Sequence, residues 1–117
     1  SSRDKLDDCM LVTGRLSFKA DTHAREQLSL VTKEGVTLRY FGATALDLAN
    51  LAAGRIDACW YYTIQPWDIA GGMLLVREAG GTVTDLAGDE AHAHSSTLLA
   101  SNRLLALPVR KLLSEAA

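Results

Sequence analysis

Apolar residues in this chain form short runs separated by glycines and polar turns, and their spacing distinguishes expected strands from expected helices. Short apolar runs predict buried strands, and strict alternation over residues 36–40 predicts a strand with one wetter face. The expected strands are residues 9–13, 36–40, 56–62, 82–86 and 97–101. The expected helices are a segment from residue 21 or 22 to 33, residues 44–53, residues 67–79 and a terminal helix with Pro108 at its first position.

The order of these elements predicts an α/β fold, because strands and helices mostly alternate and two strands follow each other late in the chain. We expect a mainly parallel or mixed sheet, layered with helices. Neither repeats nor low-complexity linkers interrupt the pattern, so residues 1–117 are expected to form a single domain.

The helix expected at residues 44–53 is apolar almost all round. Its polar residues, Thr44, Asp47 and Asn50, follow an i, i+3, i+6 spacing and form one narrow polar stripe. The turn before it, Gly42-Ala43-Thr44, could hold an anion or a hydroxyl on its backbone N–H groups. Many strand-to-helix turns of this kind bind nothing, so both interpretations stay open.

The helix expected at residues 67–79 carries one carboxylate, Asp68, in its first turn. Pro66 favours a helix start, and Gly80-Gly81 supplies a stop. Asp68 is either a first-turn carboxylate that stabilises the helix by about 1 kcal/mol, or a rigidly held Mg²⁺ ligand. Position alone favours the first interpretation.

Two glycines, Gly71 and Gly72, lie inside this helix. Each lowers helix stability by about 1 kcal/mol relative to alanine. We therefore expect another backbone element to approach closely at this point.

Composition narrows the function classes. The chain is 48% hydrophobic with a net charge of −2, which fits a globular core. No basic stripe is visible, so direct nucleic-acid binding is not expected. No apolar run approaches the length of a membrane span, and no signal-peptide pattern occurs. Cys9 and Cys59 lie far apart in apolar runs and are predicted to be buried reduced thiols, which favours the cytoplasm.

Several segments together resemble the C-terminal half of inositol monophosphatase family proteins, in matching order and spacing from Leu6 to the end. The most specific is Trp-Asp-x-Ala-(Ala/Gly)-Gly joined to Glu-Ala-Gly-Gly. The matching segments are Gly-Ala-Thr-Ala-Leu-Asp-Leu at 42–48, Ala-Gly-Arg-Ile-Asp-Ala at 53–58, Pro-Trp-Asp-Ile-Ala-Gly-Gly at 66–72, Glu-Ala-Gly-Gly at 78–81 and Leu-Ala-Ser-Asn at 99–102.

The resemblance implies the C-terminal half of the layered αβαβα sugar-phosphatase fold and Mg²⁺-dependent, Li⁺-sensitive hydrolysis of phosphate monoesters. It makes Asp68 a ligand of the active-site Mg²⁺ that also orients the attacking water, which reverses the preference from position. It places Gly42, Ala43 and Thr44 against a small phosphorylated substrate.

The chain departs from the family pattern in two respects. The family's remaining metal ligands lie in Glu-Glu and Asp-Pro-x-Asp-Gly-Thr elements of its N-terminal half, and this sequence contains neither. We therefore expect a fragment of a longer enzyme that is inactive in isolation, has the N-terminal half of the same protein as its partner, and self-associates when that half is missing.

The second departure is Tyr61, which stands where many inositol phosphatases carry a substrate-binding Glu seven residues before the metal-binding Asp. A phenol can donate and accept hydrogen bonds but carries no charge at neutral pH. Tyr61 is thus expected to line the substrate site and to alter its specificity, so inositol-1-phosphate and other small phosphate esters both remain candidates. The competing hypothesis is a non-catalytic interaction module derived from this family.

Overall fold

A computed structural model describes residues 3–7, 9–13, 35–61, 64, 66–92, 95 and 97–116. Its elements are β1 (Met10–Thr13), β2 (Thr37–Arg39), α2 (Thr44–Ala52), β3 (Ala58–Tyr61), α3 (Pro66–Glu78), β4 (Thr82–Thr84), β5 (Leu98–Ser101) and α4 (Ala106–Ala116). The helix expected from residue 21 or 22 to 33 lies outside the described residues.

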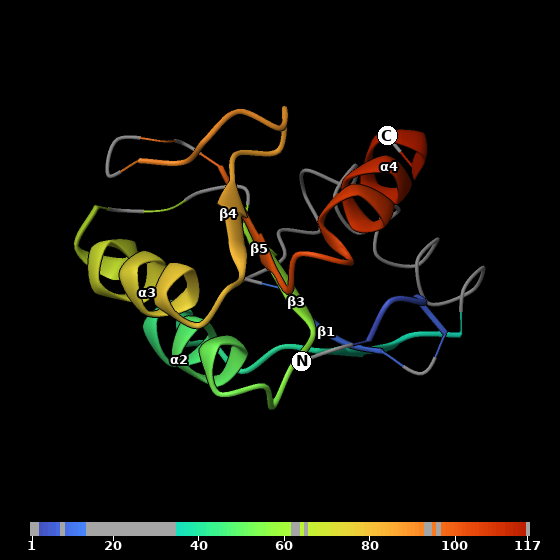
Figure 1. Ribbon diagram of the computed structural model, residues 1–117, viewed down its shortest axis with the longest axis horizontal. Coiled ribbons are helices and arrows are strands. Elements are labelled where there is room, and N and C mark those ends of the chain that lie inside the picture. Colours follow the sequence, from blue (N-terminus) through green and yellow to red (C-terminus); the bar gives the residue numbers. More distant parts are fainter. Residues whose placement is uncertain are drawn as a thin grey trace.

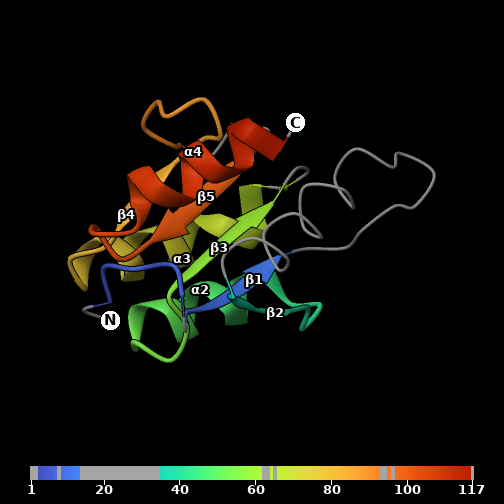
Figure 2. The ribbon, with the colours of Figure 1, turned by 90° about the vertical axis from the view of Figure 1, so that its right-hand side faces the viewer.

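The strands form one mixed sheet in the order β2-β1-β3-β5-β4. Strands β1, β2 and β3 are mutually parallel, whereas β5 runs antiparallel to both β3 and β4. Helices α2 and α3 cover one face of this sheet and α4 covers the other (Figures 1 and 2). The expected α/β class with a layered mixed sheet is confirmed.

Both faces of the central strands are buried, which is why their sequences read as continuous apolar runs. Val12 and Tyr61 point into a core beneath α2 and α3. Leu11 and Trp60, their neighbours along the same strands, point into a second core beneath α4. The sheet therefore separates two hydrophobic cores.

Helix α4 corrects one expectation, because it begins at Ala106 and Pro108 is its third residue rather than its first. The Oδ1 atom of Asn102 accepts a hydrogen bond of 2.8 Å from the Leu105 N–H, which organises the turn leading into the helix. A proline is tolerated at the third position because the first helical N–H groups have no intrahelical acceptor.

Other element boundaries differ from the expected ones by one or two residues. Strand β4 ends at Thr84 rather than at residue 86, since Asp85 enters a turn in which the Gly88 N–H donates to the Asp85 carbonyl. Helix α3 begins one residue early, at Pro66. Such shifts at the ends of elements leave the order and the direction of the chain unchanged.

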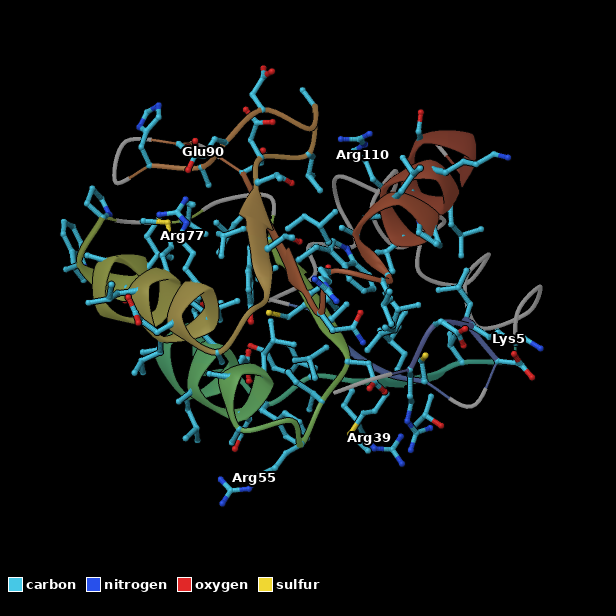
Figure 3. All side chains as sticks on the ribbon, in the orientation of Figure 1. Lys5, Arg39, Arg55, Arg77, Glu90 and Arg110 are labelled. Atoms are coloured by element: carbon cyan, nitrogen blue, oxygen red, sulfur yellow. The ribbon has the colours of Figure 1, made fainter. Side chains whose placement is uncertain are left out.

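The end of α3 is fixed to the loop that follows β4. Arg77 reaches that loop, where its Nη2 donates to the Ala91 carbonyl at 2.7 Å and lies 3.7 Å from Glu90 Oε1 (Figure 3). The ion pair is well exposed and contributes little by itself. The bond to the backbone carbonyl orients the loop over the end of the helix.

No helix among the described residues combines the length and the hydrophobicity that a membrane span needs.

Candidate functional site

Asp68 lies in the first turn of α3, as its third residue, with Pro66 as the first. Its side chain is partly exposed rather than turned into the core. Among the described residues it has neither a hydrogen bond nor an ion pair that would engage the carboxylate. The carboxylate is therefore free to take a ligand at the positive end of the helix.

The start of α2 is built by Gly42, Ala43 and Thr44. Gly42 has a φ of 77°, in the left-handed region that favours glycine, and turns the chain out of β2. Ala43 occupies the N-cap position, and no side chain caps the helix there. The first-turn N–H groups of α2 are consequently left for an external acceptor, because an N-terminal turn has no carbonyl partner of its own.

The two helix starts lie at the same edge of the sheet. Helix α2 follows β2 and α3 follows β3, and both strands run parallel to β1. Both helices therefore begin at the carboxyl edge of the parallel strands, to the left in Figure 1. In open α/β sheets this edge is where ligands bind.

A close contact between the two helices sets their register. A Cβ atom placed on Gly72 would lie 2.5 Å from the Leu48 Cδ1, so α2 and α3 meet at this pair. Thr44 and Asp68 each precede their contact residue by four positions, hence by one turn on the same helix face. Thr44 and Asp68 thus belong to adjacent first turns of two packed helices.

Another backbone element was expected to approach the two glycines of α3, but the atoms nearest to Gly72 belong to the Leu48 side chain. A Cβ on Gly71 would meet no other described atom within 4 Å. Within the described part of the chain, packing therefore gives no reason for a glycine at position 71.

Tyr61 ends β3 and points into the core beneath α2 and α3. Its side chain is only 2% exposed, and its hydroxyl donates a hydrogen bond of 2.5 Å to the Oδ2 atom of Asp47. The phenol is therefore held between β3 and α2. Its expected contact with a substrate stays a prediction.

Asp47 is the polar residue of this region that sequence reasoning did not assign to a site. It is 1% exposed, and no described group pairs with its Oδ1 atom. Burial raises the pKa of Asp47, and the Tyr61 hydroxyl offsets part of that shift by stabilising the carboxylate. The polar stripe on the otherwise apolar helix at 44–53 was the sequence signal that could have identified Asp47, since a buried carboxyl group needs a hydrogen-bond donor.

Cys59 lies on the same face of β3 as Tyr61, two residues before it. Burial raises the pKa of its thiol to about 12, so the group stays protonated and unreactive. Cys9 and Cys59 are both buried thiols that form no disulfide, as expected.

A magnesium site would need more ligands than the described residues bring together. No group of three or more His, Cys, Asp or Glu side chains that could hold a metal occurs among them. The oxygen donor of Asp68 fits Mg²⁺, which prefers carboxylates and water. Asp68 can therefore supply one ligand of such a site, and the other protein ligands would come from elsewhere.

Comparison with known proteins identifies the family to which the chain is similar. A model of the inositol monophosphatase family matches residues 1–116. The chain is 42% identical over 105 residues to the Nus factor SuhB of Escherichia coli, covering 87% of this chain and 39% of that protein. It is 36% identical over 106 residues to an inositol-1-monophosphatase of Caulobacter vibrioides, covering 88% of this chain and 41% of the relative.

A solved structure shows the same fold. The extragenic suppressor protein suhB of Bartonella henselae superposes with a TM-score of 0.90 at 36% identity, over 100% of this chain and 45% of that one. The chain thus spans less than half the length of the relatives it matches, and it corresponds to their C-terminal portion. It belongs to the inositol monophosphatase family.

Proposed function

We propose that this chain is the C-terminal portion of a Mg²⁺-dependent hydrolase that acts on small phosphate monoesters. Membership of a phosphatase family supports the reaction class. The observation that carries the proposal is the register of α2 and α3, which brings Thr44 and Asp68 into adjacent first turns at the carboxyl edge of the sheet.

The first turns of α2 and α3 each have a role in the proposed reaction. The uncapped N–H groups at Ala43 and Thr44 would hold an oxygen of the substrate, since a helix N-terminus attracts negative charge. Asp68 would contribute one carboxylate oxygen to the metal ion and orient the attacking water by accepting its hydrogen bond. When bound, Mg²⁺ would neutralise phosphate charge and lower the pKa of water.

The reaction itself is a hydrolysis. The oxygen of water forms a bond to phosphorus, the phosphorus–oxygen bond to the alcohol breaks, and the alcohol oxygen takes up a proton. One carboxylate cannot assemble the metal site, so the 117-residue chain alone is expected to bind Mg²⁺ weakly and to show no phosphatase activity.

The test is Asp68→Asn in the protein expressed from its complete reading frame, assayed with a panel of phosphate esters and titrated Mg²⁺. Loss of a metal ligand is expected to reduce kcat/KM by about a hundredfold or more and to raise the Mg²⁺ requirement, given that even indirect partners of a metal contribute about 10–100-fold. Glu78→Gln is the matched control, because this exposed acid lies at the opposite end of the same helix.

Unchanged activity in Asp68→Asn, or robust Mg²⁺-dependent turnover by the 117-residue chain alone, would contradict the proposal. A whole protein that hydrolyses no phosphate ester would favour the alternative, a non-catalytic interaction module. That alternative draws its support from the Escherichia coli relative, whose name describes it as a Nus factor.

A further inference from the structure

Helix α4 has an apolar inner side and a mixed outer side. Its inner side packs into the core beneath it through Val109 and two leucines. The outer side carries Leu107, Arg110, Lys111 and Ser114, at the i, i+3, i+4, i+7 spacing of one helix face. Leu107 is 62% exposed and lies one turn before the two cationic residues. The outer side therefore combines apolar surface with positive charge.

A groove lies between the outer side of α4 and the loop that follows β4. Its volume is about 440 Å³, and it is lined by Leu86, Ala87, Leu107, Arg110, Lys111 and Ser114. Ligand sites typically have volumes of about 300–1,000 Å³. Half of the lining residues are apolar, and two of them are cationic at neutral pH. The groove is thus large enough for a ligand that offers both apolar and acidic groups.

The position of Arg110 in this groove depends on Gly88. Gly88 has a φ of 98°, in the left-handed region that favours glycine, and a Cβ atom there would collide with Nη1 of Arg110. The guanidinium therefore lies directly against the backbone of the loop, between the loop and α4 (Figure 3). Among the described residues, Arg110 has neither a hydrogen bond nor an ion pair. Its donors are available to a partner.

The acidic residues of the same loop do not neutralise Arg110. Asp85 accepts a hydrogen bond of 2.9 Å from the Asp89 N–H on its Oδ1 atom, and Glu90 Oε1 lies 3.7 Å from Arg77. Within the described part of the chain, none of these three acids forms an ion pair with Arg110. The positive charge of the groove therefore remains uncompensated by the loop.

Charge complementarity and the apolar lining together indicate the kind of occupant. A carboxylate can accept two parallel hydrogen bonds from a guanidinium. An apolar side chain beside that carboxylate would remove Leu107 from water. The backbone of a nucleic acid supplies phosphates without an apolar group, and the chain has a net charge of −2, which disfavours a polyanion. A peptide with acidic and apolar side chains matches both features of the groove.

We propose that this groove binds an acidic peptide segment of another protein. One apolar side chain of the segment lies on Leu86 and Leu107, and neighbouring carboxylates pair with Arg110 and Lys111. The groove belongs to the side of the sheet that α4 covers, whereas Asp68 lies in α3 on the other side (Figures 1 and 2). The proposal therefore holds whether or not the protein is a phosphatase.

The test is selection of a random peptide library, displayed on phage, on the protein expressed from its complete reading frame. Enriched peptides should carry Asp or Glu close to a large apolar residue. Their Kd, measured by fluorescence anisotropy, should rise with salt concentration, because exposed ion pairs are screened. Peptides enriched without acidic residues, or no enrichment at all, would overturn the proposal.

Three variants locate the binding site. Arg110→Glu combined with Lys111→Glu should weaken binding of the enriched peptide about tenfold or more, because like charges would then face each other. Lys111→Glu alone, at an exposed position where folding is not at risk, should weaken it about threefold. Leu107→Ser should weaken it by a similar factor without changing its salt dependence. Unchanged affinity in the double variant would overturn the proposal, and unchanged affinity in Leu107→Ser would refute the apolar contact.

The matched control is Arg39→Glu combined with Arg55→Glu, which makes the same change in net charge at exposed residues away from α4 (Figure 3). This variant should bind the peptide like the native protein. An equal loss in the control would show that binding follows net charge rather than the groove, and would overturn the proposal. A short single-stranded DNA that displaced the peptide with equal affinity would assign the groove to nucleic acid and would also overturn it.

Discussion

At the scale of single residues, the Asp47 carboxyl and the Tyr61 hydroxyl dominate the chemistry of the core beneath α2 and α3. Tyr61 supplies the carboxyl with one donor, and the second carboxyl oxygen has none among the described groups. A buried carboxylate in this state is unfavourable relative to its protonated form. Asp47 therefore couples the stability of the α2–β3 contact to pH.

The sign of that coupling follows from the raised pKa of Asp47. The folded chain holds the proton more tightly than the unfolded chain, so the stability conferred by the protonated carboxyl is complete below about pH 4. It is lost as the pH rises through the raised pKa. Asp47→Asn stays neutral throughout and should therefore gain stability relative to the native chain as the pH rises from about 4 through the raised pKa of Asp47.

Urea unfolding of the 117-residue chain at a series of pH values checks this prediction. Tyr61→Phe is the informative companion, because removing the donor raises the pKa of Asp47 further and extends the loss to higher pH. A stability difference between Asp47→Asn and the native chain that stayed constant with pH would show that the carboxyl does not titrate in this range.

At the scale of elements, the sequence predicted most of what the structure contains. Apolar runs and helical spacing located all the described strands and helices, and Gly72 indicated the contact between α2 and α3. The Asp47–Tyr61 pair was not predicted, because it joins a helix to a strand and depends on how the two are positioned in space. The start predicted for the last helix at Pro108 was wrong by two residues, because a proline is tolerated throughout the first turn of a helix.

The two helix glycines provide a matched prediction at this scale. In the 117-residue chain, Gly72→Ala should lower the free energy of unfolding by about 1–2 kcal/mol, because overpacking against Leu48 outweighs the gain in helix propensity. Gly71→Ala meets open space and should raise it by up to about 1 kcal/mol. Thermal and urea denaturation measure both effects.

A second substitution tests whether contact with Leu48 causes the loss of stability in Gly72→Ala. Leu48→Ala leaves a cavity in the native chain, but it should lower the free energy of unfolding by less in the Gly72→Ala background, because there it also removes the colliding side chain. If Gly72→Ala and Gly71→Ala had the same effect, α2 and α3 would not meet at Gly72.

At the scale of the whole molecule, the described residues expose more apolar surface on α3 than on α4. Helix α3 exposes Trp67, Leu74 and Leu75, at 78%, 60% and 51%, whereas α4 exposes Leu107, at 62%. Asp68, the carboxylate of the proposed metal site, lies in the first turn of the same helix α3.

That asymmetry predicts how the isolated 117-residue chain behaves in solution. Exposed apolar surface drives association in water, so the chain should self-associate through Trp67, Leu74 and Leu75 of α3 as its concentration rises. Leu74→Asp combined with Leu75→Asp should keep the chain monomeric, because a charge cannot be buried there without a partner. Leu107→Asp, which adds a charge at an equally exposed leucine on α4, should associate like the native chain.

Light scattering across a concentration series distinguishes these outcomes. A native chain that remained monomeric at high concentration would contradict the prediction, because the exposed side chains of α3 would then be too few to drive association. If Leu107→Asp blocked association equally well, the associating surface would lie on α4.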